Sequence, residues 1–342
     1  MIHSEWLAKR EGLTNGYIMI INAAELKRRY LKRIAGIRDK TVYIGPEIVT
    51  LNVNLSCNLT CRFCGPQKPA SWGAQPQPAD YYQWEKFLRV VKDCIELKVD
   101  TIQFLGGEPT THPLFRNLLR HLEDKPLKVK VYTNATFPAE YCTDVIRADH
   151  VVVNLSAADR ETYFKLTGSD LFDQAVDNIK RLVLLRDSVK PDFCIEIVCV
   201  VNTINKDQQS RISDLAGRLG VHSVLFRRMQ VSDYNRAIAF PEDDREQRSP
   251  PVCLSGWFNM VLMPDGKVSA CGEVLKMPIG DFNKLDLKEL WASERMMNIR
   301  LLGKHGKIQK MYDVCQSCPY YSENMAWMQD AAGLERNNRV SV

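Results

Sequence analysis

An alternation of strand-like and helix-like segments from residue 48 onward most constrains the fold of this 342-residue chain. Apolar segments of the kind that form strands are 48–55, 100–106, 128–133, 150–155, 193–201 and 223–229. Segments with helical periodicity lie between them at 80–98, 112–122, 138–147, 159–165, 171–188 and 206–219. Such alternation favours parallel strands joined by right-handed helical crossovers. We therefore expect an α/β fold whose functional site lies at the carboxyl ends of the strands.

Three cysteines, Cys57, Cys61 and Cys64, follow the first expected strand. A tight loop with this spacing can direct three thiolates at one metal centre. A closed zinc site or an ordinary [4Fe–4S] cluster takes four protein ligands, so three thiolates on such a cluster would leave one iron open to an outside ligand. A zinc site that borrows its fourth ligand from elsewhere, and chance clustering in a chain with 11 cysteines, are the alternatives.

A second motif, Gly106-Gly107-Glu108-Pro109, follows the second expected strand. Glycines let the backbone approach a ligand closely, and a carboxylate at this place can receive an ammonium group. Taken alone, the motif is an ordinary turn between a strand and a helix.

The C-terminal part contains four further cysteines, which are Cys253, Cys271, Cys315 and Cys318. The turn sequence Pro-Asp-Gly at 264–266 predicts a hairpin that brings the first two together. The last two are separated by two residues, a spacing that puts two thiolates on one ion. An iron–sulfur cluster and a structural zinc site with four thiolate ligands both fit these residues.

The cysteine triplet resembles the signature of the radical S-adenosylmethionine (radical SAM) enzymes, and Gly-Gly-Glu-Pro is similar to their second motif. The resemblance implies a partial (β/α)6 barrel, which six strand and helix units match. It also implies that S-adenosylmethionine chelates the open iron. An electron from the cluster would cleave it to a 5′-deoxyadenosyl radical, which abstracts a substrate hydrogen.

The same resemblance implies which residues contact the cofactor. It places Phe63 near the adenine and the motif of Gly106, Gly107 and Glu108 at the amino group. Asn134 and Ser156 match further positions of cofactor contact.

The order of the C-terminal cysteines resembles the twitch domain, a short relative of the SPASM domain. That resemblance implies one auxiliary [4Fe–4S] cluster whose irons are all ligated by protein. It also implies an electron donor such as a flavodoxin or a ferredoxin.

Side chains alternate between the two faces of a strand, so every second residue shares a face. This alternation puts a set of polar residues on one face of the expected strands. They are Thr50, Asn52, Asn54, Gln103, Asn154, Ser156, Glu196, Asn202 and either Arg228 or Arg227. These residues indicate a small polar substrate, or else they satisfy one another. The candidate catalytic residues are Glu196 and Arg228. Apolar neighbours could raise the pKa of Glu196 and make it a base, although it equally fits an interior hydrogen-bond acceptor. Cys194 is expected on the face of Glu196, and Cys199 on the opposite, helix-facing side.

Four regions are expected: an N-terminal arm at 1–45, the barrel at 46–240, a twitch-like domain at 241–325 and a tail at 326–342. The basic run at 27–33 has helical spacing, which indicates the solvated face of a helix. The net charge of +5 does not indicate nucleic acid as an obligatory partner.

No apolar run reaches the length of a membrane span. Eleven cysteines without a secretory signal indicate a reducing cytoplasm.

The expected reaction is oxidation or epimerisation of a carbinol carbon in a sugar or aminocyclitol. An auxiliary cluster with no open iron is suited to carry electrons, and the domain layout resembles twitch-type aminocyclitol dehydrogenases. Hydrogen return from a thiol would invert the carbon instead. Modification of a ribosomally made peptide is an alternative, for which the segment 1–45 is short for a complete recognition domain. A zinc-binding interaction module is the alternative of another class.

Overall fold

The computed structural model describes residues 23–64, 81–232, 234–240, 251–275, 277–308, 315, 318 and 324–329. Residues 1–22 of the expected arm and 330–342 of the expected tail lie outside the described residues. The strands are β1 (Ile48–Asn54), β2 (Thr101–Gly106), β3 (Lys128–Thr133), β4 (His150–Asn154), β5 (Cys194–Val201), β6 (Ser223–Arg228), β7 (Asn259–Leu262), β8 (Lys267–Ser269) and β9 (Gly280–Asp281).

Helices separate the strands in the expected alternation, so the α/β fold class is confirmed. The α-helices are α2 (Ala23–Asp39), α3 (Trp84–Glu96), α4 (Phe115–Leu122), α5 (Cys142–Val145), α6 (Arg160–Thr167), α7 (Phe172–Val189), α8 (Gln209–Leu219), α9 (Ser255–Phe258), α10 (Leu287–Ala292) and α11 (Glu294–Lys304). Short 3-10 turns are η2 (Pro109–Thr111), η3 (Ala139–Tyr141), η4 (Lys206–Gln208), η5 (Arg236–Ile238) and η6 (Gly272–Val274).

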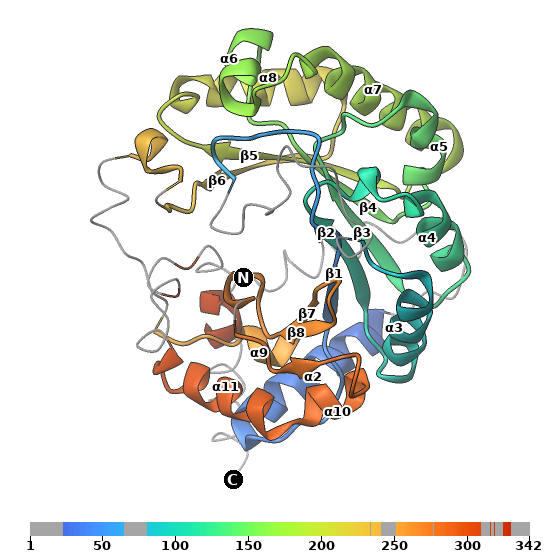
Figure 1. Cartoon of the computed structure of the whole chain (residues 1–342), viewed down its shortest axis with the longest axis vertical. Coiled ribbons are helices and arrows are strands. Elements are labelled where there is room, and N and C mark those ends of the chain that lie inside the picture. Colours follow the sequence, from blue (N-terminus) through green and yellow to red (C-terminus); the bar gives the residue numbers. More distant parts are fainter. Residues whose placement is uncertain are drawn as a thin grey trace. The chain divides into compact units, whose positions relative to one another are not determined.

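The strands form one sheet in the order β6-β5-β4-β3-β2-β1-β7-β8-β9 (Figure 1). The pairs β3–β4, β4–β5 and β5–β6 are parallel, as is β1–β7, whereas β7–β8 and β8–β9 are antiparallel. The helices α4, α5, α7 and α8 cover the outer side of β3 to β6 (Figure 1). This arrangement is the partial barrel with a small C-terminal domain that the sequence predicts.

The chain forms two compact units. Unit 1 contains the described parts of 53–81 and 103–240, and unit 2 contains the described parts of 24–52, 82–102 and 241–342. The predicted boundary between 45 and 46 does not coincide with this division, because the start of β1 pairs with β7 and α3 contacts α10. The four predicted regions themselves stay a prediction.

In unit 1, the two faces of β5 differ in exposure. Ile195, Ile197 and Cys199 are completely buried, whereas residues 194, 196, 198 and 200 are half-buried. Cys199 packs in an apolar cluster with Ile212 of α8, so the odd-numbered residues face the helices and the even-numbered ones face the interior of the partial barrel. The predicted orientations of Cys194 and Cys199 are thereby confirmed. The inner face of β5 is therefore covered less completely than the face that packs on the helices.

In unit 2, α2 packs on the aromatic side chains of Trp257 and Phe258. Arg29 pairs with Asp100 at 2.5 Å, and Arg33 pairs with the other oxygen of Asp100 at 3.0 Å. Both arginines are buried, so the expectation that the basic run is a solvated face is wrong for these two residues. Buried carboxylates on neighbouring segments neutralise them, and the pairs hold α2 against the start of β2.

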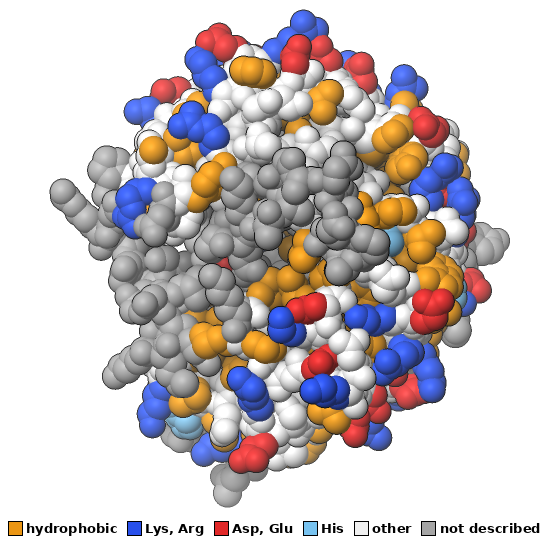
Figure 2. Space-filling model, in the orientation of Figure 1, with side chains coloured by type: hydrophobic (Ala, Val, Ile, Leu, Met, Phe, Trp, Pro, Cys, Tyr) orange, Lys and Arg blue, Asp and Glu red, His pale blue; other side chains and the backbone are white. Residues whose placement is uncertain are grey.

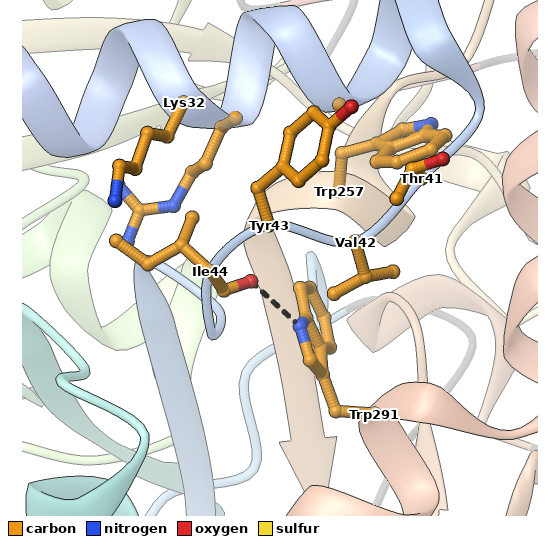
Figure 3. A pocket seen from close by; sticks show the side chains of 9 residues that line it. Lys32, Thr41, Val42, Tyr43, Ile44, Trp257 and Trp291 are labelled. Atoms are coloured by element: carbon orange, nitrogen blue, oxygen red, sulfur yellow. Dashed lines mark hydrogen bonds between the residues drawn. The ribbon is translucent and has the colours of Figure 1, made fainter.

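A small pocket in unit 2 lies beside the loop that follows α2 (Figure 3). Tyr43, Trp257 and Trp291 contribute its aromatic walls, and the indole Nε1–H of Trp291 donates a hydrogen bond of 2.9 Å to the carbonyl of Ile44. The indole N–H of Trp291 thus has its hydrogen-bond partner in the backbone that lines the same pocket.

On the face shown in Figure 2, positive and negative side chains are interspersed over the described surface. No helix of the described residues is both long and apolar enough to cross a membrane.

Candidate active site

The three cysteines of the triplet lie half-buried in the loop after β1. Burial raises the pKa of Cys57 to about 12, and the charges of Glu108 and Cys64 add to the effect. Burial also raises the pKa of Cys61, with further contributions from Cys57 and Cys64. The three thiols therefore share one neighbourhood. The raised pKa values of Cys57 and Cys61 mean that a metal which binds them displaces their protons, as in other thiolate sites.

The end of helix α6 fixes this loop in place. The N–H of Thr60 donates to the carbonyl of Thr167 (3.1 Å), and the N–H of Arg62 donates to the carbonyl of Leu166 (2.8 Å). Gly168 ends the helix with a left-handed φ of +72°, and a Cβ there would lie 2.5 Å from Oγ1 of Thr60. The terminal carbonyls of α6, which have no partner within the helix, thus bind the backbone of the cysteine loop.

The two glycines of the second motif allow close contact with the strand that precedes the cysteines. The N–H of Gly107 donates to the carbonyl of Asn54 (3.1 Å), and the N–H of Glu108 donates to the carbonyl of Ser56 (2.8 Å). Gly106 has a φ of +137°, which only glycine adopts readily. A Cβ on Gly107 would collide with the carbonyl of Ser56. Gly106 is required because the end of β1 at Asn54 occupies the space of a side chain, and Gly107 because the backbone of the cysteine loop does.

We expect Gly107→Ala to lower the free energy of unfolding by about 3 kcal/mol, because the backbone of the cysteine loop cannot yield as a flexible side chain would. Gly217→Ala is the matched control, since a Cβ at this position in α8 meets no atom within 4 Å. The control should raise stability by about 0.5–1 kcal/mol, the usual gain in a helix interior. Urea unfolding followed by circular dichroism measures both. Equal stability of the two variants would contradict this account.

Glu108 is only 2% exposed, and its carboxylate is engaged by the chain itself. Oε1 accepts hydrogen bonds from the N–H (3.1 Å) and Oγ1 (2.7 Å) of Thr110 and from Oγ1 of Thr133 (2.7 Å). Oε2 accepts one from the N–H of Asn134 (2.7 Å). Burial raises the pKa of Glu108, and these four hydrogen bonds oppose the rise. The carboxylate ties the end of β3 to the turn after β2. Its contact with the amino group of S-adenosylmethionine stays a prediction.

Asn134 also joins the end of β3 to the cysteine loop. Its Nδ2 donates to Oδ1 of Asn58 (2.9 Å), and Nδ2 of Asn58 donates to Oγ1 of Thr136 (2.8 Å). Phe63 lies buried in the same loop. The structure therefore brings the triplet, the glycine motif, Phe63 and Asn134 together at the carboxyl ends of β1, β2 and β3.

Ser156 lies just beyond the end of β4 and is 3% exposed. Its Oγ donates to Oδ1 of Asn154 (2.9 Å) and accepts from the N–H of Val200 (2.9 Å). The hydroxyl thus joins the ends of β4 and β5, and its cofactor contact stays a prediction.

Glu196 lies on the inner face of β5, but toward the other end of the strands. Its Oε2 lies 3.2 Å from Nε2 of His150, and Oγ of Ser223 donates to its Oε1 at 3.2 Å. His150 and Ser223 are the first residues of β4 and β6, whereas the cysteine loop follows a carboxyl end. The hydrogen bond from His150 lowers the pKa of Glu196, against the effect of burial. The expectation of a raised pKa is therefore wrong, and the placement disfavours Glu196 as the base.

The structure also corrects the choice between two adjacent arginines at the end of β6. In the parallel ladder Arg228 pairs with Val201, which belongs to the helix-side apolar cluster. Arg228 is exposed on that side, and its guanidinium lies 5.8 Å from the ring centroid of Phe240. Arg227 pairs with Val200 on the inner face and is half-buried. The arginine that faces the interior is Arg227, because side chains alternate along a strand.

The four C-terminal cysteines form a second group in unit 2. Burial raises the pKa of Cys271, and the charges of Cys253 and Cys318 add to it. Burial raises the pKa of Cys315 to about 11, again with a contribution from Cys253. These mutual influences place the four thiols in one neighbourhood. The hairpin of β7 and β8, with Gly266 at φ +95°, confirms the predicted turn that connects the first two.

Among the described residues, no three His, Cys, Asp or Glu side chains stand around one point so as to hold a single metal ion.

Sequence reasoning missed the residues that fix the cysteine loop. Asn58, Thr133 and Thr167 act through one or two hydrogen bonds each to segments distant in sequence. The sequence offers no periodic signal for such contacts; Gly168, directly after α6, is a signal only for the end of that helix.

Comparison with known proteins agrees with this geometry. The family model of the radical SAM superfamily matches residues 51–202, and that of the SPASM iron–sulfur cluster-binding domain matches residues 253–319. Together they match more than half of the chain.

Two curated relatives named probable GTP 3′,8-cyclase show the extent of the sequence similarity. The protein of Pyrococcus abyssi is 24% identical over 219 residues, which are 61% of this chain and 68% of the relative. That of Saccharolobus islandicus is 26% identical over 207 residues, which are 58% of this chain and 63% of the relative. The similarity thus spans about two thirds of these relatives.

Two solved structures share the fold. Streptococcus suis SuiB bound to S-adenosylmethionine has a TM-score of 0.63 at 17% identity, over 93% of this chain and 82% of SuiB. Native anSMEcpe with bound AdoMet and a Cp18Cys peptide has a TM-score of 0.57 at 16% identity, over 86% of this chain and 99% of that chain.

The cofactors expected from the sequence are confirmed: S-adenosylmethionine, a [4Fe–4S] cluster at the radical SAM site, and an auxiliary cluster in the C-terminal domain. The zinc-binding interaction module is thereby set aside. The chain belongs to the radical SAM superfamily and carries a C-terminal SPASM iron–sulfur cluster domain.

Proposed function

We propose that this radical SAM enzyme removes a hydrogen atom from a carbinol carbon of a small polar substrate and thereby oxidises or epimerises a sugar or aminocyclitol. The observation that carries the proposal is the inner face of the partial barrel. Along β5 its side chains are half-buried, and polar side chains of β4 and β6 lie at the end where the cysteine loop sits. Arg227 is the residue before the last in β6, and Asn154 is the last residue of β4. Nδ2 of Asn154 has no partner among the described residues, so it is available to a ligand hydroxyl.

The chain's own residues hold and enclose the reacting groups. The terminal carbonyls of α6, the Glu108 network and Asn134 position the cysteine loop, while Arg227 and Asn154 offer hydrogen-bond donors to the substrate. When bound, the cluster and S-adenosylmethionine supply a 5′-deoxyadenosyl radical that takes the hydrogen atom. Oxidation to a ketone then requires the loss of one proton from the hydroxyl group and of one electron. We propose the C-terminal domain as the route of that electron.

We also propose a flavodoxin or a ferredoxin as the external electron donor, because the first step consumes one low-potential electron. A reducing cytoplasm suits such a donor. In support, all eleven cysteines are free of disulfides.

A second candidate is the modification of a ribosomally made peptide. It is supported by likeness of fold to SuiB, which has also been solved bound to its precursor peptide SuiA, with a TM-score of 0.58 over 87% of this chain and 77% of SuiB. A shared fold does not imply a shared substrate. We therefore prefer the small-molecule proposal, which the polar groups of the inner face support.

The test uses anaerobically reconstituted protein with dithionite, S-adenosylmethionine and substrates deuterated at carbon. A panel of deuterated sugars and aminocyclitols is compared with a panel of deuterated peptides. Deuterium in 5′-deoxyadenosine from a sugar or aminocyclitol, with a ketone or epimer formed, supports the proposal. Deuterium transfer from peptides alone would contradict it and support the second candidate.

Arg227→Ala is expected to lower kcat/KM about tenfold to a hundredfold, because a hydrogen bond from a charged group to the substrate contributes about 1.5–3 kcal/mol. Arg228→Ala is the matched control, since this arginine lies on the helix side over Phe240, and it should leave kcat/KM within about twofold. Steady-state assays of product formation measure both. An equal loss in the two variants would show that the inner face is not the substrate site.

A further inference from the structure

The Tyr163 hydroxyl is a buried polar group close to the cysteine loop. Tyr163 lies in α6 and is 2% exposed, and its hydroxyl has no hydrogen-bond partner among the described residues. A buried hydroxyl without a partner costs about 1–3 kcal/mol, so folded proteins rarely keep one. This hydroxyl is therefore open to an acceptor that joins the protein after it folds.

The position of Tyr163 is fixed from several sides. Its backbone N–H donates to the carbonyl of Asp159 (3.0 Å), and its carbonyl accepts from Oγ1 of Thr167 (2.8 Å). Its ring meets the ring of Phe172 edge to face, with centroids 5.8 Å apart. The phenol is thus held in one orientation by the helix that also fixes the cysteine loop.

The surroundings of the hydroxyl identify the acceptor. Thr167 and Leu166, one turn further along α6, bind the backbone N–H groups of Thr60 and Arg62 on either side of Cys61. Burial raises the pKa of Tyr163, and the ionisable groups that act on it further are Cys61, then Glu108, then Cys57. Glu108 already accepts four hydrogen bonds. The sulfurs at the cysteine loop are the acceptors that remain.

We propose that the Tyr163 hydroxyl donates a hydrogen bond to a sulfur of the [4Fe–4S] cluster held by Cys57, Cys61 and Cys64. Thiolate and sulfide sulfurs of a cluster carry negative charge and accept hydrogen bonds, and the number of such bonds helps to set the reduction potential. The bond is stronger in the reduced cluster, which carries one more negative charge. Tyr163 therefore makes the cluster easier to reduce. This inference rests on the family membership of the chain and not on the identity of the substrate.

The experiment is a redox titration of the reconstituted protein, followed by electron paramagnetic resonance in the absence of S-adenosylmethionine. Tyr163→Phe keeps the ring and removes only the hydroxyl. At a fixed potential the ratio of reduced to oxidised cluster should fall about tenfold, a shift of about 59 mV for a one-electron couple. Tyr141→Phe is the control, because the ring of Tyr141 lies on the outer side of unit 1, 5.0 Å from the guanidinium of Arg116. Its titration should match that of the unaltered protein.

Two further measurements separate the possible outcomes. Iron content should be equal in both variants, and affinity for S-adenosylmethionine, measured by equilibrium dialysis, should change less than twofold. An unchanged potential with weakened S-adenosylmethionine binding would overturn the proposal and assign the hydroxyl to the cofactor. An unchanged potential and affinity, or loss of iron from Tyr163→Phe, would make the residue a packing element and overturn it too.

Discussion

Cys57→Ala is expected to reduce the cleavage of S-adenosylmethionine to background. The radical SAM cluster takes three protein ligands, so removal of one thiolate leaves two, too few to hold the four-iron cluster. The alanine also leaves the rest of the loop in place, because its anchors to α6 are backbone hydrogen bonds of Thr60 and Arg62. The readout is 5′-deoxyadenosine formed per protein under dithionite, with iron measured on the same sample.

Cys142→Ala is the matched control for this variant. Cys142 is buried in α5, and its sulfur lies 3.9 Å from the carbonyl oxygen of Asn178, in a purely structural position. Its loss should cost about 1–2 kcal/mol of stability through a small cavity and leave cleavage intact. Cleavage retained by Cys57→Ala, or lost equally by Cys142→Ala, would contradict the assignment of the triplet.

The double variant Cys315→Ala/Cys318→Ala is expected to keep cleavage of S-adenosylmethionine and to lose net product. The two thiolates belong to the C-terminal group, so their removal takes away about half of the iron and the proposed electron route. The triplet in unit 1 keeps its own ligands. Comparison of 5′-deoxyadenosine with product, measured in one reaction, separates the two effects.

Cys94→Ala serves as the control in unit 2, because Cys94 is completely buried in α3 and its pKa responds to burial and Asp93 alone. It should keep both iron and product at the level of the unaltered protein. Unchanged product in the double variant would make the C-terminal site purely structural. Loss of cleavage in that variant would show that the two sites depend on each other for folding.

The order of strands and helices was predictable from sequence because it depends on local periodicity. The expected strand at 128–133 coincides with β3, and that at 223–229 ends one residue beyond β6. The cysteine positions and the Pro-Asp-Gly turn were predictable for the same reason, since spacing within a short segment sets their geometry.

The orientation of single side chains depended on contacts between distant segments. The prediction that Arg228 and not Arg227 faces the interior was wrong. A shift of one residue at the end of a strand exchanges the two faces, and the sequence does not fix that position. The pKa of Glu196 was misjudged because His150 lies 46 positions away in sequence and next to it in space. The buried pairing of Arg29 with Asp100 is a contact of the same long-range kind.

The unpartnered hydroxyl of Tyr163 illustrates a further limit. Nothing in the sequence around Tyr163 distinguishes it from a core aromatic of α6, and its ring does pack as one against Phe172. Only the complete set of hydrogen bonds in the folded chain shows that the hydroxyl has no partner among the described residues. Unsatisfied buried groups of this kind depend on the three-dimensional fold and have no signal in the sequence.

The most direct test of the central claim is the iron and acid-labile sulfide content of the anaerobically reconstituted protein, measured together with 5′-deoxyadenosine formed under dithionite. Two [4Fe–4S] clusters predict about eight irons and eight sulfides per chain, with 5′-deoxyadenosine produced. About four irons with the same activity would leave the C-terminal cysteines without a cluster. Zinc in place of iron, with no cleavage of S-adenosylmethionine, would contradict the account of both sites.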